Sequence, residues 1–212
     1  MKKITALILC LLSIPAFAED WYEDQDYTST PKRDTYVGFR LHQNKHIAFG
    51  YEINDGANTT LKDDSFGVGL TVGNRLTNHV KIEFETLYTN GKERKYDTDF
   101  NFDIWANMLN VYIYQQFDGA VEPYAGIGIG LAGLWGNVNG GGLDMSESTA
   151  DMTWSLMLGV NFALNDRIDL NVGVKYQNYG DLDFNNNGEA YASTEIDATE
   201  IYIGASYKFG LK

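Results

Sequence analysis

The chain has 212 residues and a formal net charge of −13, with 29 acidic side chains against 16 Lys and Arg. This length suits a single domain, and so acidic a balance argues against a nucleic-acid partner, which needs a basic patch. It favours a surface that repels anions or collects cations. Beyond the N-terminal segment no stretch is long and apolar enough for a membrane helix, so a chain that spans a membrane must use strands.

Residues 1–18 have the layout of a secretory signal peptide. Two lysines precede an apolar run, and the small-x-small sequence Ala16-Phe17-Ala18 ends it. The run is shorter than the about 20 apolar residues that a membrane helix needs. We expect cleavage after Ala18, which also removes Cys10, the only cysteine. The mature chain then has no disulfide and no thiol chemistry.

Residues 19–34 are polar and acidic, and we expect them to form a lead-in on the periplasmic side. Apolar and polar residues begin to alternate near residue 36 and keep the same parity through Ile53. Residues 36–53 therefore form either one long strand or a hairpin that turns at residues 43–45. The long strand is favoured because bacterial single-chain barrels have even strand numbers.

Further along the chain, period-two alternation marks seven more strands. Their apolar faces lie within Phe66–Val72, Val80–Tyr88, Trp105–Phe117, Ala125–Trp135, Trp154–Phe162, Ile168–Tyr176 and Ile201–Phe209. With the first strand they predict an all-β fold, a transmembrane antiparallel up-and-down β-barrel of about eight strands over residues 35–212.

The connections between these strands alternate in length. The short ones are Asn74–Asn78, Asp118–Glu122 and Asn165–Arg167, and the long ones are Asp55–Asp64, Asn90–Asp103, Asn137–Asp151 and Asn178–Ser193. Short periplasmic turns and long extracellular loops are typical of outer-membrane barrels. The four long connections are therefore expected to be external loops, of which the third is expected to be mobile.

Aromatic residues distinguish this pattern from a soluble lipocalin-type barrel, which turns its apolar face inward. On the apolar face they gather at the strand ends. The expected outer ends carry Phe66, Tyr88, Trp105, Trp135, Trp154 and Tyr176, and the inner ends carry Phe117, Phe162 and Phe209. Such rings prefer headgroup depth and form girdles at both rims of a membrane barrel.

The opposite face of the strands combines glycine with charge. Its charged residues are Arg40, Lys81, Glu83, Glu85, Asp169, Lys175, Glu200 and Lys208. Eight strands leave an interior that side chains just fill, and a buried charge is costly unless it is paired. We expect a paired plug, and the alternative is a narrow pore for ions.

The stretch Val121-Glu122-Pro123-Tyr124-Ala125-Gly126-Ile127-Gly128-Ile129-Gly130 resembles a hallmark strand of opacity-type surface antigens and related OmpA-like small barrels. Residues 65–85 resemble the preceding hairpin, and residues 170–176 and 203–209 resemble the last two strands. The aromatic end of the final strand resembles the signal read by the barrel-assembly machinery. The resemblance implies a Gram-negative outer-membrane protein in a family of adhesins, invasins, immune-evasion factors and structural barrels.

One stretch matches the opening of a calcium loop, D-x-N-x-N-G, with Asp183, Asn185 and Asn187 as candidate oxygen ligands. Thr194 stands where the bidentate Glu of such a loop is expected. The competing interpretation is a flexible turn rich in Asn and Gly. We expect no other cofactor.

The histidines give little sign of catalysis. No serine stands out as a partner for His42 or His46, and His79 begins a strand at a periplasmic turn. A nucleophile needs a base within hydrogen-bond reach and a group that orients that base. These histidines are therefore interpreted as solvated or lumen side chains, and an enzyme is not expected.

The sequence predicts an outer-membrane surface protein, structural or adhesin-like, that works through its loops. Its expected partners are outer-membrane lipid, the barrel-assembly machinery during biogenesis, and a host or extracellular ligand at the loops. The first alternative is a narrow, porin-like ion channel, and the second is a barrel-borne enzyme.

Overall fold

The computed structural model describes residues 35–52, 58–61, 65–95, 98–117, 120–140, 143–186 and 189–209. The predicted signal peptide and lead-in lie outside these residues. The strands are β1 (Thr35–Glu52), β2 (Asn58–Leu61), β3 (Ser65–Arg75), β4 (Val80–Lys95), β5 (Thr98–Tyr114), β6 (Val121–Gly140), β7 (Leu143–Ala163), β8 (Ile168–Asn186) and β9 (Glu189–Phe209). No helix in the described part of the chain is long and apolar enough to cross a membrane.

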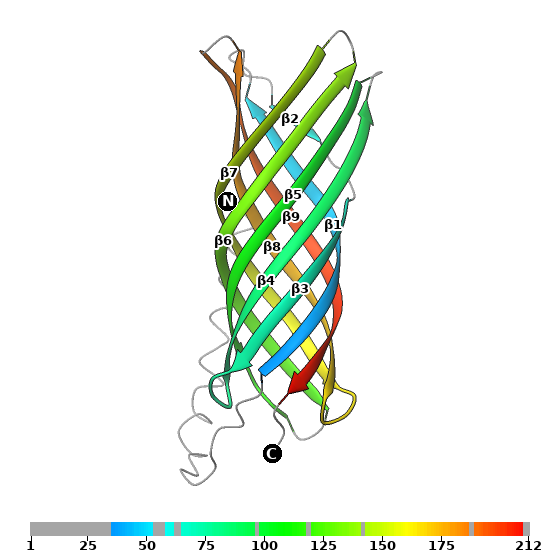
Figure 1. The fold of residues 1–212 in the computed structure, drawn as a ribbon, viewed down its shortest axis with the longest axis vertical. Coiled ribbons are helices and arrows are strands. Elements are labelled where there is room, and N and C mark those ends of the chain that lie inside the picture. Colours follow the sequence, from blue (N-terminus) through cyan, green and yellow to red (C-terminus); the bar gives the residue numbers. More distant parts are fainter. Residues whose placement is uncertain are drawn as a thin grey trace. The chain divides into compact units, whose positions relative to one another are not determined.

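The long strands close into one antiparallel up-and-down barrel (Figure 1). Neighbours in sequence pair from β3 to β9, and β9 pairs back to β1. The short β2 only extends the ladder at the end of β1, so the predicted count of eight barrel strands is confirmed. β1 is also the single long strand that was favoured over a hairpin, with a register irregularity between Asn44 and Ile47.

One end of the barrel, here called the turn end, carries the three short connections that the sequence predicts. They join β3 to β4, β5 to β6 and β7 to β8. In the last of them the Asn165 side-chain oxygen accepts hydrogen bonds from the backbone N–H groups of Arg167 and Ile168, both at 2.9 Å. Asn closes tight turns in this way because its side chain replaces a backbone acceptor.

At the opposite end, the hairpin end, the expectation of long irregular loops is wrong. The described residues of Asn90–Asp103, Asn137–Asp151 and Asn178–Ser193 belong to strands, and pairing reaches Lys95 opposite Thr98, Gly140 opposite Leu143 and Asn186 opposite Glu189. Part of Asp55–Asp64 is strand β2. The Asn, Asp and Gly content suggested loops. Continuing the ladder from the barrel below instead pairs backbone N–H and C=O groups across each hairpin.

The outer wall of the barrel is apolar, and the interior holds the polar side chains. Strand β3 shows this directly, because its residues alternate between buried and exposed along most of its length. All nine aromatic residues predicted for the lipid interfaces point outward and are exposed. Two pairs of them are in ring contact, Tyr88 with Trp105 at 6.4 Å and Trp154 with Tyr176 at 5.6 Å between centroids.

Four interior tyrosines each lie directly opposite a glycine on the neighbouring strand. The pairs are Tyr36 with Gly73, Tyr112 with Gly126, Tyr124 with Gly159 and Tyr202 with Gly173. In each pair a Cβ added to the glycine would collide with the tyrosine ring. The glycines thus make room for large rings in a narrow barrel.

Candidate functional site in the barrel interior

The interior has three layers between the turn end and the hairpin end. The mouth cluster consists of Arg75, Glu122, Asp169 and Lys208. The central cluster consists of Arg40, His42, Lys81, Glu83, Glu85, Lys175 and Glu200. The apolar layer consists of Leu87, Ile104, Ala106, Met108, Ala132, Leu134, Tyr179, Ile196 and Ala198.

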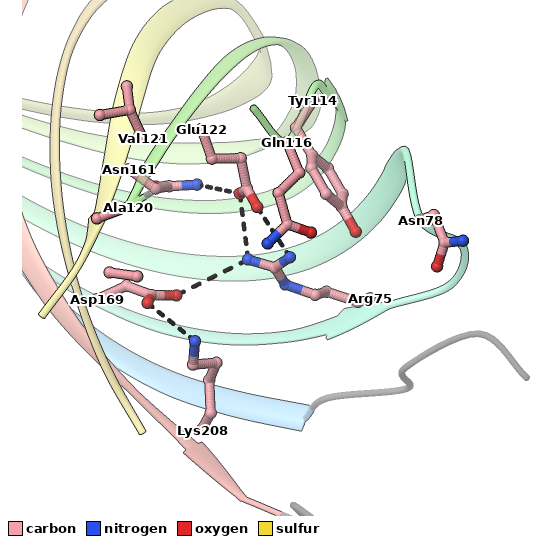
Figure 2. A pocket seen from close by; sticks show the side chains of 11 residues that line it. Arg75, Asn78, Tyr114, Gln116, Ala120, Val121, Glu122, Asn161, Asp169 and Lys208 are labelled. Carbon is pink, nitrogen blue, oxygen red and sulfur yellow. Dashed lines mark hydrogen bonds and ion pairs between the residues drawn. The ribbon is translucent and has the colours of Figure 1, made fainter. Parts of the chain in front are cut away.

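The mouth cluster joins side chains from β3, β6, β8 and β9 by ion pairs (Figure 2). Arg75 Nη1 lies 2.8 Å from Glu122 Oε2, and Lys208 Nζ lies 2.9 Å from Asp169 Oδ1. Asn161 donates a hydrogen bond of 2.7 Å to Glu122. A longer contact of 3.8 Å between Arg75 and Asp169 links the two ion pairs.

A cavity of about 90 Å³ lies at this mouth. It is lined by Arg75, Asn78, Tyr114, Gln116, Ala120, Val121, Glu122, Asn161, Ala163, Asp169 and Lys208. A second cavity of about 10 Å³ shares Arg75, Asn161 and Asp169 and reaches Arg40 and Lys81. That volume is close to the minimum for one water molecule. The hollow therefore narrows as it meets the central cluster.

In the central cluster, Arg40 on β1 holds two glutamates of β4. Its Nη1 and Nη2 lie 2.7 and 3.0 Å from the two oxygens of Glu83, a bidentate contact, and Nη1 lies 3.1 Å from Glu85 Oε1. The hydroxyls of Tyr36 and Tyr112 each donate to Glu83 at 2.9 Å. All five side chains are buried. Such charge-assisted, bidentate bonds are the strong class of protein hydrogen bonds.

The rest of the cluster gathers around Glu200 on β9. Lys175 Nζ lies 3.3 Å from Glu85 and 3.9 Å from Glu200, and the Tyr179 hydroxyl donates to Glu200 at 2.6 Å. His42 has Nδ1 at 2.8 Å from Glu200 Oε2 and Nε2 at 3.4 Å from Glu85 Oε1. The sequence interpretation left His42 as solvated or in the lumen, and the structure places it between two lumen carboxylates. The sequence already indicated a lumen position for His42, because His42 and Arg40 are two residues apart and so face the same side of the strand.

Lys81 differs from the other interior cations. None of the ion pairs between described residues includes it. Its ammonium lies 4.8 Å from the ring centroid of Tyr112 and 4.6 Å from that of Tyr124. The expectation of carboxylate pairing is therefore not met at Lys81, because Arg40 already occupies the neighbouring Glu83. Two tyrosine rings provide a cation–π environment instead.

The interior charges balance layer by layer. The central cluster has three carboxylates, from Glu83, Glu85 and Glu200, against the cations Arg40, Lys81 and Lys175. The mouth cluster has two of each sign. Apart from His42, the charges of the two clusters therefore cancel, which gives little basis for selecting ions of one sign.

Above the charges, the apolar layer fills the barrel toward the hairpin end. The sequence interpretation described the inner face as a mixture of glycine and charge and did not include this layer. Leu87 and Leu134 are each 1% exposed, and Ile104 is 2% exposed. Leu87 shares the parity of Glu83 and Glu85 on β4, and Leu134 shares that of Glu122 on β6, so alternation already indicated that they face inward. The apolar layer was missed because a loop was predicted at Asn90–Asp103, next to these residues.

The candidate calcium ligands lie elsewhere. Asp183 and Asn185 belong to β8, where they pair with Ser193 and Ala190 of β9, and Asn187 lies outside the described residues. A paired, extended backbone differs from the loop that the motif requires. Within the residues that the structure covers, no group of three or more His, Cys, Asp or Glu is placed to hold a metal ion.

The chain matches a model of the outer membrane protein beta-barrel domain over residues 4–209. It is 26% identical over 161 residues to uncharacterized proteins of Brucella abortus (strain 2308) and Brucella suis biovar 1. Each match covers 71% of this chain and 54% of the relative. The chain thus spans about half the length of these curated relatives.

Solved structures with the same fold are small barrels. Neisserial surface protein A is 21% identical, with a TM-score of 0.56, over 82% of this chain and 97% of that one. OprG from Pseudomonas aeruginosa is 15% identical, with a TM-score of 0.55, over 84% and 96%. Ail of Yersinia pestis, in complex with the heparin analogue sucrose octasulfate, is 13% identical, with a TM-score of 0.51, over 84% and 99%. At these identities the likeness shows the fold.

Proposed function

Because the chain belongs to the outer membrane protein beta-barrel domain family, we propose that it is a closed surface protein of the outer membrane, structural or adhesin-like, that acts through its paired hairpins. The turn end, where both ends of the barrel lie, faces the periplasm in barrels of this kind. The hairpin end then faces outward, in the position from which surface proteins meet their partners.

The filled interior is the observation that supports this proposal. An ion that entered from the turn end would meet the balanced central cluster and then the apolar layer. Crossing the apolar layer requires loss of the ion's hydration where buried aliphatic side chains leave few polar groups to replace it, which is costly. The outer hairpins are therefore better placed for function than the lumen.

The charge of the hairpins indicates the sign of their partner. No Lys or Arg stands between Lys95 and Arg167, or between Lys175 and Lys208. Ail was solved with a polyanion, sucrose octasulfate. The β6–β7 and β8–β9 hairpins of this chain carry only acidic charges, so a partner with basic groups fits them better.

The test compares bacteria that display the parent barrel with bacteria that display a variant whose β6–β7 and β8–β9 hairpins are shortened above Trp154. The readout is binding to immobilised extracellular proteins, and the heat-dependent gel mobility of each barrel checks folding. We expect the shortened variant to fold and to lose binding. Equal binding by the two barrels would overturn the proposal.

A narrow channel is the second candidate, and the cavity at the mouth is the observation that favours it. The hollow enters the interior from the turn end, as one half of a pore would. Flux of small ions from liposomes that contain the refolded protein separates the two candidates. A closed barrel leaves the liposomes sealed, whereas a channel empties them.

A further inference from the structure

The wall of the barrel is interrupted between β7 and β8. β7 pairs with β6 along its whole length, from Leu143 opposite Gly140 to Phe162 opposite Val121. It pairs with β8 only from Ala163 up to Trp154, which lies opposite Asn178. Both strands continue toward the hairpin end, but no further pairing joins them among the residues described.

Local structure at the last pair explains why the two strands part. Gly180 has a positive φ of 93°, and the β8–β9 register shifts between Asn178 and Asp181. The Thr153 hydroxyl donates to the Asn178 carbonyl at 2.6 Å, so a side chain takes the place of the next backbone bond. A bulge with a glycine in the left-handed region turns a strand away from its neighbour.

Above this point the barrel divides into two paired walls. One wall contains β4, β5, β6 and β7, and the other contains β8, β9, β1 and β2. Figure 1 shows the tip of the β6–β7 hairpin standing apart from the tip of the β8–β9 hairpin. Residues Leu143–Ala150, here called the β7 edge, have a strand partner on the β6 side alone among the residues described. Closer to the barrel, the Asp151 side chain lies against Gly180 of β8.

An open strand edge is a template for another strand, and its charge restricts which strand can bind. The β7 edge contains Asp144 and Glu147 and has no basic residue. The outer part of β8 contributes Asp181 and Asp183 and is equally free of Lys and Arg. A second copy of this chain would bring like charges together, which opposes edge-to-edge pairing of two barrels.

We propose that the β7 edge is a docking site for an extended peptide segment that carries Lys or Arg, which adds to β7 as an antiparallel strand. In this mode main-chain hydrogen bonds supply affinity and the side chains supply specificity. The site rests on the proposed function in one respect, namely that the hairpin end is the recognition surface. Beyond that function, this proposal specifies the place on the surface where the partner binds and the chemistry of the partner.

The probe is a labelled peptide that alternates lysine and threonine and matches the β7 edge in length, added to the protein in nanodiscs. We expect saturable binding by fluorescence anisotropy and slower amide exchange at Leu143–Ala150. N-methylation of alternate residues keeps the charge but removes main-chain donors, and should weaken binding about tenfold or more. A peptide with glutamate in place of lysine should not bind.

Paired variants locate the site. The variant Asp144→Asn/Glu147→Gln should weaken binding several-fold. Glu93→Gln/Asp99→Asn, which removes the same charge from β4 and β5, should leave binding near the parent value. Equal binding of the N-methylated peptide, or exchange protection away from the β7 edge, would overturn strand addition there. Ion flux measured on the same preparations separates the two proposals, because a conducting barrel that still binds the peptide contradicts only the closed lumen.

Discussion

The central cluster and the apolar layer occupy the same lumen and lie on the same faces of the same strands, yet they are built differently. In the central cluster each charge depends on partners from other strands, as Arg40 of β1 depends on Glu83 and Glu85 of β4. A register slip of one residue would move these groups to the lipid face. The apolar layer needs volume rather than specific partners. The comparison suggests that charges fix the register of the barrel and apolar side chains seal it.

The largest expected effect comes from breaking the central cluster. Arg40→Met removes the bidentate partner of Glu83 and leaves buried carboxylates uncompensated, which should lower the free energy of unfolding by about 3–5 kcal/mol. Urea titration of the protein in lipid vesicles, followed by tryptophan fluorescence, measures the change.

Arg167→Met is the matched control, because Arg167 is exposed at a turn and its side chain, among the hydrogen bonds of the described residues, reaches only the Tyr207 hydroxyl. We expect its effect to stay within about 0.5 kcal/mol. Similar losses for the two arginines would mean that the central cluster does not hold the barrel together.

The second effect probes the apolar layer. Leu134→Ala leaves a cavity in a packed layer and should cost about 2–4 kcal/mol. Leu131 lies on the same strand but is 63% exposed on the outer wall, and Leu131→Ala should cost less because lipid can fill the space. The same titration compares the two variants. Equal losses would show that the layer is loosely packed and does not seal the lumen.

The third effect concerns the space that glycines leave in the lumen. Gly126→Ala places a methyl group against the Tyr112 ring and should cost about 1–3 kcal/mol by overpacking. Gly136 is on the same strand with nothing within 4 Å of an added Cβ. Gly136→Ala should therefore be near neutral, and a similar cost for both would refute the tyrosine–glycine account.

The smallest expected effect tests the difference between Lys81, which lies over two tyrosine rings, and Arg40, which forms ion pairs. Lys81→Met keeps an apolar stem of similar length and removes the contacts of the ammonium with two tyrosine rings, so we expect a loss of about 1–2 kcal/mol. The loss should be clearly smaller than that for Arg40→Met in the same titration. If the losses match, Lys81 has a carboxylate partner in the membrane that its position over the rings does not reveal.

Much of the fold was predictable because alternation is a local property of a strand. It gave the eight barrel strands, their faces, the long first strand and the short turns. The paired hairpins at Asn137–Asp151 and Asn178–Ser193 were not predictable, because their polar composition is shared by loops and only cross-strand pairing distinguishes the two.

The residues of the interior clusters were predictable from the sequence, but the ion pairs between them were not. Parity placed the charged residues inside, but which carboxylate meets which cation depends on the strand stagger. The stagger places Glu83 within ion-pair distance of Arg40 and places Lys81 over the rings of two tyrosines. The apolar layer was visible in the parity of Leu87 and Ile104, and it was missed because a loop was expected next to them.

Single-channel conductance of the refolded protein in a planar bilayer tests the closed lumen most directly. With the central cluster paired and the apolar layer packed, we predict no openings in the parent protein. Reproducible openings that change with Glu83→Gln or Lys81→Gln would contradict this, because they would mean that water and ions reach the charged layer and pass the apolar one.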